Sequence, residues 1–216
     1  MLRVDHLCLA HVPQLRPLSF ELGAGQLLTV VGPSGSGKTS LVKVLCGFQA
    51  PRAGHVHLGD QNLLGLTPDQ LIGRYLAVVP AGRTIFPRLS GLDNLLMGGM
   101  SLRRHERMRR LSEVLQLIPK LLAWQDQIAD TLSGGEGQWL VVGRALMSHA
   151  RVVILDDVSV GLSRLARDEF LALLKQLKQQ SYAILMTESD AAWLAEVEDQ
   201  RLLLTTSSET ALLKRM

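Results

Sequence analysis

One glycine-rich stretch constrains the fold more than any other part of the chain. Residues 32–40 read Gly-Pro-Ser-Gly-Ser-Gly-Lys-Thr-Ser and fill every position of the phosphate-loop pattern G-x-x-x-x-G-K-[ST]. Residues 26–31 before it are rich in Leu, Val and Thr, which predicts a buried strand. Residues 40–48 after it place apolar side chains on one helical face. Strand, loop and helix together predict an α/β core. The alternative is a Gly/Ser turn that happens to precede a helix. It is less favoured, because such a turn would not be expected to fill every position of the pattern or to have these flanking segments.

The residue types in this loop suit a nucleotide's phosphate groups. Glycines let the backbone wrap an anion, so that N–H groups and the helix N-terminus point at it. Lys38 offers a positive charge to the β- and γ-phosphates, and the Thr39 hydroxyl can bind Mg²⁺. We therefore assign nucleotide binding to Gly32, Pro33, Ser34, Gly35, Ser36, Gly37, Lys38, Thr39 and Ser40.

Composition narrows the class of protein. The 216 residues have room for one large α/β domain, with or without a subdomain. The net charge of +3 is too small to indicate nucleic-acid binding, although a mildly basic, slightly apolar domain suits an anionic membrane surface as well as free solution. No run approaches the roughly 18 apolar residues of a membrane span, and no signal-peptide core is expected. The two isolated cysteines predict reduced thiols in a cytosolic protein.

The middle of the chain predicts a helical insertion. Residues 80–89 contain Pro and Gly and indicate a surface loop, and residues 93–124 have a helical pattern interrupted at Pro119. Residues 101–110 carry five arginines ahead of an apolar face. Such a helix could contact phospholipid or RNA, or simply present a solvated face.

Two further motifs follow the insertion. Ser133, Gly134 and Gly135 open a predicted helix, where Ser133 is a natural N-cap and the glycines allow close approach of a ligand. Residues 152–157 read Val-Val-Ile-Leu-Asp-Asp, a strand that ends in two acids and is typical of a Walker B segment. We expect Asp156 to hold Mg²⁺ through water and Asp157 to polarise the attacking water.

Together, in this order, the three motifs resemble the nucleotide-binding subunit of an ATP-binding cassette (ABC) transporter. Residues 79–89 are further similar to the V-P-x-G-R-x-I-F-P-R-L stretch of importers for branched-chain amino acids and urea. The resemblance implies a single ABC ATPase domain over residues 1–216. Its P-loop NTPase (RecA-like) core would span 1–89 and 132–216, with an antiparallel β layer and an all-helical subdomain at about 90–131.

The resemblance also implies partners and a location. Two cassettes, identical or different, would close head to tail over two ATP molecules with Mg²⁺. Each phosphate loop would then face the partner's Ser133, Gly134 and Gly135. Closure would drive a pair of transmembrane permease subunits, which the helical insertion and the 80–89 loop would meet. The chain would be peripheral, on the cytoplasmic face of the inner membrane, with no nucleic-acid partner.

Several positions depart from the family pattern. Ala81 replaces the usual Gln, and Asp157, the expected catalytic carboxylate, is one methylene shorter than the usual Glu. Glu188 falls where a switch histidine is expected, and an acid beside the γ-phosphate should repel it. His11 is the only ring near the place of an adenine-stacking aromatic, although a plain surface histidine is the simpler interpretation. The chain also ends soon after Thr205, so we expect it to lack the glycine-bearing last hairpin.

Two functions therefore remain open from the sequence. The first is a transport ATPase, slowed by its altered site, in which Lys38 and Asp157 are the catalytic residues. It would couple ATP hydrolysis to import of amino acids or urea. The second is a degenerate cassette that binds ATP without hydrolysing it and acts as a regulatory half beside a competent partner.

Overall fold

The computed structural model describes residues 1–82, 84–205 and 213–215, so Arg83 of the 79–89 segment lies outside the described residues. Its centre is a six-stranded sheet with the order β10-β9-β3-β8-β7-β6. Five of its strands, β9, β3, β8, β7 and β6, run parallel to one another. The near-continuous burial of β3, β7 and β8 is typical of a sheet covered on both faces. The strands are β3 (Leu27–Val31), β6 (Leu76–Val79), β7 (Val152–Asp156), β8 (Ala183–Glu188), β9 (Gln200–Leu203) and β10 (Leu213–Arg215).

A second, four-stranded antiparallel sheet has the order β2-β1-β4-β5, which confirms the expected antiparallel layer. Alternate residues of β2 are buried, as expected of a sheet with one covered face. The strands are β1 (Leu2–Cys8), β2 (Leu18–Leu22), β4 (Ala53–Leu58) and β5 (Gln61–Asn62). Helix α1 (Lys38–Leu45) shares one apolar core with both sheets, so its position is fixed from two sides.

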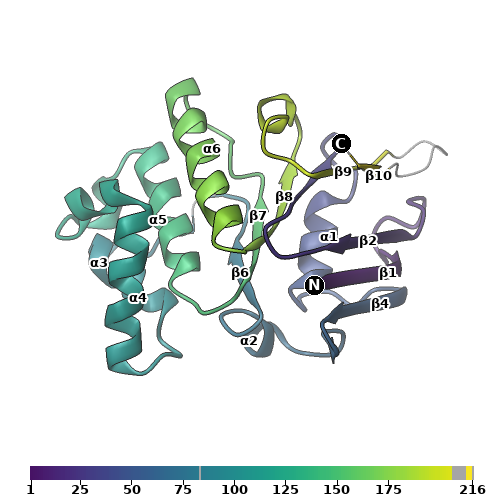
Figure 1. The fold of residues 1–216 in the computed structure, drawn as a ribbon, viewed down its shortest axis with the longest axis horizontal. Helices are drawn as coiled ribbons and strands as arrows, with labels where there is room; N and C mark the ends of the chain where they lie inside the picture. The colour runs from purple at the N-terminus through teal and green to yellow at the C-terminus, as the bar shows by residue number, and fades with distance from the viewer. Residues whose placement is uncertain (83, 206–212, 216) are drawn as a thin grey trace.

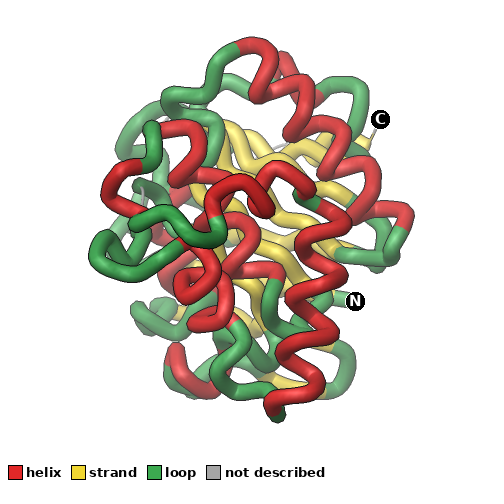
Figure 2. The backbone as a smooth tube through the Cα atoms, turned by 90° about the vertical axis from the view of Figure 1, so that its left-hand side faces the viewer, coloured by secondary structure: helices red, strands yellow, loops and turns green. Residues whose placement is uncertain are grey.

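The helices between β6 and β7 lie at the opposite end of the molecule from the antiparallel sheet (Figure 1). Seen from their side, they lie in front of the strands (Figure 2). The helices are α3 (Gly91–Gly98), α4 (Arg104–Leu117), the 3-10 turns Pro119–Trp124 and Ala129–Thr131, and α5 (Gly134–Leu146). Helix α6 (Arg164–Gln179) joins them in a second apolar core, and α2 (Pro68–Leu71) is a single turn before β6. That the chain is one domain with a subdomain at about 90–131 stays a prediction.

Residues 93–124 were expected to be helical with one interruption, at Pro119. The structure has an earlier break as well, since α3 ends at Gly98. A Cβ atom at Gly98 would lie only 1.9 Å from the carbonyl oxygen of Arg144 on α5. This contact requires glycine, and the pair Gly98 and Gly99 then favours a break. Periodicity alone does not reveal such a tertiary contact.

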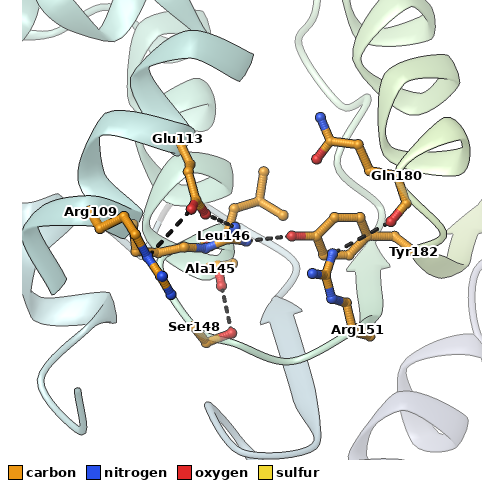
Figure 3. A network of polar contacts seen from close by, with 9 residues as sticks. Arg109, Glu113, Ala145, Leu146, Ser148, Arg151, Gln180 and Tyr182 are labelled. Atoms are coloured by element: carbon orange, nitrogen blue, oxygen red, sulfur yellow. Dashed lines mark hydrogen bonds and ion pairs between the residues drawn. The ribbon is translucent and has the colours of Figure 1, made fainter. Parts of the chain in front are cut away.

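One of the five arginines is buried, contrary to an interpretation in which all five are surface charges. Arg110 is 5% exposed, and its Nε donates a hydrogen bond to the carbonyl of Leu146 at 2.7 Å. Its other nitrogens donate to Glu113 at 2.8 Å and to the Tyr182 hydroxyl. Figure 3 shows this network, which joins α4 to the end of α5 and to the residue before β8.

The end of the chain also differs from expectation. Strand β10 pairs antiparallel with β9, so the described residues do include a last antiparallel pair. The link at 206–212, which contains no glycine, lies outside the described residues. No helix in the described parts of the chain has both the length and the apolarity that crossing a bilayer requires.

Candidate nucleotide site

A hollow of about 250 Å³ lies at the carboxyl ends of the parallel strands, where ligands of α/β folds usually bind. The phosphate loop, the acid after β7 and the residue after β8 contribute to it, together with the loop after β1. Its lining comprises His11, Val12, Pro33, Ser34, Gly35, Gly37, Lys38, Thr39, Ser40, Asp157 and Ser189. Residues from four separate parts of the sequence therefore meet at one place.

The phosphate loop has the backbone that anion binding requires. Gly35 and Gly37 have φ angles of 79° and 107°, in a region that other residues rarely adopt. Gly37 is the N-cap of α1 and supplies no side-chain cap, so the first N–H groups of the helix stay available to a ligand. The Ser36 Oγ atom is buried and has no hydrogen-bond partner among the described residues. The loop thus fits a nucleotide's phosphates.

Lys38 is held inside the loop rather than in solvent. It is 5% exposed, and its Nζ donates to the carbonyl of Gly32 at 2.7 Å and more weakly to that of Pro33 at 3.4 Å. A third partner is the Ser189 hydroxyl at 3.2 Å. The ammonium group is therefore already placed at the hollow, as its predicted role requires.

The two expected Mg²⁺ ligands have different positions. Thr39 lines the hollow, whereas Asp156 is 2% exposed and is not among the described residues that line it. Asp156 Oδ1 accepts a hydrogen bond from the Thr187 hydroxyl at 2.6 Å. A hydroxyl and a carboxylate are the oxygen donors that Mg²⁺ prefers, and the recessed Asp156 suits binding through water. Both assignments remain predictions.

Asp157 enters the hollow from a strained turn. Its φ of 47° is left-handed, a conformation that Asp tolerates better than most residues. The backbone N–H donates to the carbonyl and the hydroxyl of Thr187, both at 3.1 Å. Its Oδ1 is buried without a hydrogen-bond partner in the described chain, and burial raises the pKa of this carboxyl. An unpartnered carboxylate oxygen beside a phosphate loop fits the predicted role toward water.

Glu188 does not face the hollow, so the expected repulsion of a γ-phosphate is not supported by this geometry. Its carboxylate accepts hydrogen bonds from the Ser159 N–H at 3.2 Å and the Ser159 hydroxyl at 2.5 Å. Glu188 is 2% exposed, and burial raises its pKa to about 7. Among the described lining residues it is Ser189 that takes the place expected of Glu188. No sequence pattern pointed to Ser189, because a single serine after a strand is a common residue.

The Ser-Gly-Gly segment forms a separate surface. Ser133 caps α5: its Oγ accepts from the Glu136 N–H at 3.4 Å, and the Glu136 carboxylate accepts from the Ser133 N–H at 2.8 Å. These hydrogen bonds lower the pKa of Glu136. Ser133, Gly134 and Gly135 are not among the described residues of the hollow. Their expected contact with a partner's nucleotide stays a prediction.

The structure places two further residues at which the sequence departs from the family pattern, Ala81 and His11. Ala81 is exposed and brings only a methyl group to the loop after β6. His11 is exposed, as a surface histidine would be, yet it also lines the hollow. Its ring is therefore available to a bound base. From the sequence, a plain surface histidine was the simpler interpretation.

The fold and the hollow define a P-loop nucleotide-binding domain. The chain belongs to the ABC transporter family, whose model matches residues 15–160. The branched-chain amino acid transport ATP-binding protein BraG of Pseudomonas aeruginosa is 32% identical over 189 residues, covering 88% of this chain and 81% of that protein. The taurine import ATP-binding protein TauB of the same species is 36% identical over 169 residues, covering 77% of this chain and 62% of that protein.

Solved structures share the fold. An ATP-binding cassette of an ABC transporter in its ADP conformation has a TM-score of 0.85 at 21% identity, covering 100% of this chain and 91% of that chain. A dimeric bacterial ABC transporter cassette has a TM-score of 0.84 at 19% identity, covering 100% of this chain and 98% of that chain. The chain is an ATP-binding subunit of an ABC transporter, in a family of ATPases.

Proposed function

We propose that this chain binds ATP with Mg²⁺ in the hollow and hydrolyses it slowly to power import of amino acids or a similar small polar solute such as urea. One observation carries the proposal: Lys38 and Asp157, far apart in sequence, line the same hollow as the phosphate loop. A phosphate-binding loop with a carboxylate beside it has the parts that phosphoryl transfer to water needs.

The residues of this chain have distinct roles in that reaction. The loop N–H groups and the start of α1 hold the phosphates, and Lys38 neutralises charge at the β- and γ-positions. Thr39 and, through water, Asp156 would hold Mg²⁺, which supplies further charge neutralisation when bound. Asp157 orients the attacking water, and its raised pKa makes it a better proton acceptor.

The solute class rests on the family comparison and on the 79–89 segment. BraG, and LivF of Archaeoglobus fulgidus at 30% identity over 185 residues, are named for branched-chain amino acid transport. TauB is named for taurine and PotA of Bacillus cereus for spermidine and putrescine, at similar identities. Since related cassettes serve different solutes, we infer that the permease selects the solute and that this chain supplies the energy.

Partners are proposed for two surfaces. The exposed start of α5 at Ser133 would meet a second cassette, together with Val160, which is 77% exposed on the loop that follows Asp157. An apolar groove of about 320 Å³ includes Phe48, Phe86 and Met97 in its lining. We assign to it an apolar helical segment of the transmembrane permease, which would hold this chain at the cytoplasmic face of the inner membrane.

The second candidate, a cassette that binds ATP without turnover, is favoured by Ala81 and by the short side chain of Asp157. ATPase turnover of the purified chain with Mg²⁺, measured over a range of protein concentrations beside nucleotide binding, separates the two. We expect slow turnover that rises cooperatively with concentration, because each site needs a partner's Ser133 surface. Binding without turnover at any concentration would establish the second candidate instead.

A further inference from the structure

The start of helix α4 carries positive charges that the nucleotide site does not use. Of the five arginines in residues 101–110, Arg110 is buried within its network. Arg103 and Arg104 are exposed, and neither takes part in an ion pair among the described residues. Glu106 is the only acid of this segment, and its carboxylate accepts a hydrogen bond from the Arg103 N–H at 3.2 Å. This end of the helix therefore has a surplus of positive charge at the surface.

Helix stability does not account for these two arginines. Arg103 is the N-cap of α4, and Arg104 is its first residue. The N-terminus of a helix carries a partial positive charge, so basic side chains are favoured at the other end. An N-cap is also normally Ser, Thr, Asp or Asn, whose side chains accept from the first N–H groups. The charge at this end of α4 is therefore better matched to a partner outside the chain than to the helix itself.

Exposed methionines accompany these arginines. Met100 is 62% exposed and Met108 is 50% exposed. Met108 lies one helical turn after Arg104, so both are on the same side of α4. Apolar side chains next to basic ones suit the boundary between lipid head groups and acyl chains. Residues 99–117 contain no Phe, Tyr or Trp, whereas RNA-binding surfaces usually stack bases on aromatic rings. The side chains of this surface thus favour an anionic bilayer over RNA.

The same end of the insertion borders the apolar groove that we assign to the permease. Met97 and Gly98 of α3 line that groove, and Met100 follows two residues later. A Cβ atom at Gly73, which also lines the groove, would lie 3.9 Å from the Oγ atom of Ser101. A permease segment seated in the groove would come from the bilayer, so the start of α4 would lie on the side that faces the membrane.

We propose that the α4 surface, formed by Met100, Arg103, Arg104 and Met108, contacts the head groups of anionic phospholipids beside the permease. The chain would then be held at the bilayer by two contacts, the groove and the α4 surface. The inference rests on the proposed function, because it takes from it the position of the permease at the groove. Attraction between basic side chains and an anionic membrane is screened by salt, so this contact should weaken as the ionic strength rises.

The test measures how the purified full chain partitions between buffer and vesicles in a sedimentation assay, without nucleotide or permease. Vesicles of phosphatidylcholine alone are compared with vesicles that contain roughly one-third phosphatidylglycerol. We expect the wild type to bind the anionic vesicles and not the neutral ones, and to be released by salt. The double variant Arg103→Gln, Arg104→Gln should lose roughly tenfold in partition, because each basic residue near an anionic membrane adds to the binding energy.

The matched control is the double variant Arg3→Gln, Arg52→Gln. Both arginines are exposed, Arg3 on β1 and Arg52 directly before β4. Their antiparallel sheet lies at the opposite end of the molecule from the helical insertion (Figure 1). This control loses the same positive charge as the α4 variant and should bind the anionic vesicles like the wild type.

Three results would overturn the inference. Equal partition into neutral and anionic vesicles would remove the electrostatic contact, and an equal loss in the control would assign the binding to net charge. A homopolymeric RNA that binds the wild type more tightly than the vesicles do, and binds the α4 variant less tightly, would make this a nucleic-acid surface. The proposed function is tested separately, because vesicle binding needs no nucleotide. ATP turnover without vesicle binding would overturn only this inference, whereas vesicle binding by a chain that binds no nucleotide would overturn only the proposed function.

Discussion

Glu188 and Ser159 are joined by two hydrogen bonds that fasten the loop after β7 to the end of β8. Both residues are buried, and the loop between Asp156 and Leu162 also carries Asp157. Glu188 is therefore a support for the candidate catalytic loop rather than a charge facing the nucleotide. If Glu188 faced the nucleotide, replacing it by the histidine of the family pattern would be expected to raise ATPase turnover. The observed geometry predicts the opposite.

Glu188→His should lower ATPase turnover instead of raising it. The imidazole cannot accept from both Ser159 groups, and we expect a loss of about 2 kcal/mol in the free energy of unfolding. Ser159→Ala should have a smaller effect, and the two changes should be non-additive because they remove one interaction. Denaturant unfolding and turnover of both single variants and the double variant provide the measurement. A histidine variant that turns over faster than the wild type would contradict the supporting role.

The same carboxyl predicts a pH dependence of stability. Burial raises the pKa of Glu188 from 4.5 to about 7, an effect that Asp157 reinforces and Arg167 opposes. The folded protein then binds a proton more tightly than the unfolded chain, so this contribution to stability falls as the pH rises from about 4.5 to about 7. Glu188→Gln should flatten that part of the unfolding profile. An identical slope in wild type and variant would assign the dependence to other groups.

Asp157→Asn should reduce turnover by at least about 100-fold, because it removes the group that accepts the proton from water. ATP binding and the melting temperature should change little, since Asn has the same shape and also tolerates the left-handed φ of 47°. Single-turnover hydrolysis and nucleotide titration measure the two effects separately. Unchanged turnover would remove Asp157 from the reaction.

Lys38→Ala should abolish measurable ATP binding, because no other cation lines the phosphate end of the hollow among the described residues. Lys43→Ala is the matched control, at an exposed position of the same helix. A fluorescent nucleotide displaced by ATP reports the affinity of each variant. Tight ATP binding by Lys38→Ala would refute the phosphate-loop assignment.

Arg110→Met should destabilise the fold by about 3 kcal/mol, because it leaves the Leu146 carbonyl and the Tyr182 hydroxyl without their buried donor. Arg109→Met, one residue earlier with a side chain that is 69% exposed, should stay within about 0.5 kcal/mol of the wild type. Urea unfolding of both variants gives the comparison. Equal effects would mean that the Arg110 network adds nothing to stability.

Local sequence patterns predicted the phosphate loop, the strands beside it and the two acids at the end of β7, Asp156 and Asp157, because each depends on residues close together in the chain. The burial of Arg110 could not be predicted, since its partners Leu146 and Tyr182 are brought to α4 only by tertiary packing. The break in the insertion has the same cause, a contact between Gly98 and Arg144.

At the candidate site, the sequence did not predict the direction in which side chains at the end of β8 point. Glu188 was expected at the phosphate because of its place in the sequence, but the hydrogen-bonding groups of Ser159 turn it away. Ser189 reaches the hollow from the next position. Whether a residue at the end of a strand faces a ligand depends on the loop beside it, and this loop has a strained turn at Asp157 that the sequence does not specify.

Strand β8 connects two places that have been described separately. Tyr182, which binds the buried Arg110 of the helical insertion, precedes its first residue, and Ser189, which contacts Lys38, follows its last. All six residues of the strand are buried, and it is paired on both sides by β3 and β7. Such a strand behaves as a stiff rod of roughly 20 Å that cannot stretch or slip by a fraction of a residue. The helical insertion at one end and the candidate phosphate site at the other are therefore linked by one continuous, buried strand.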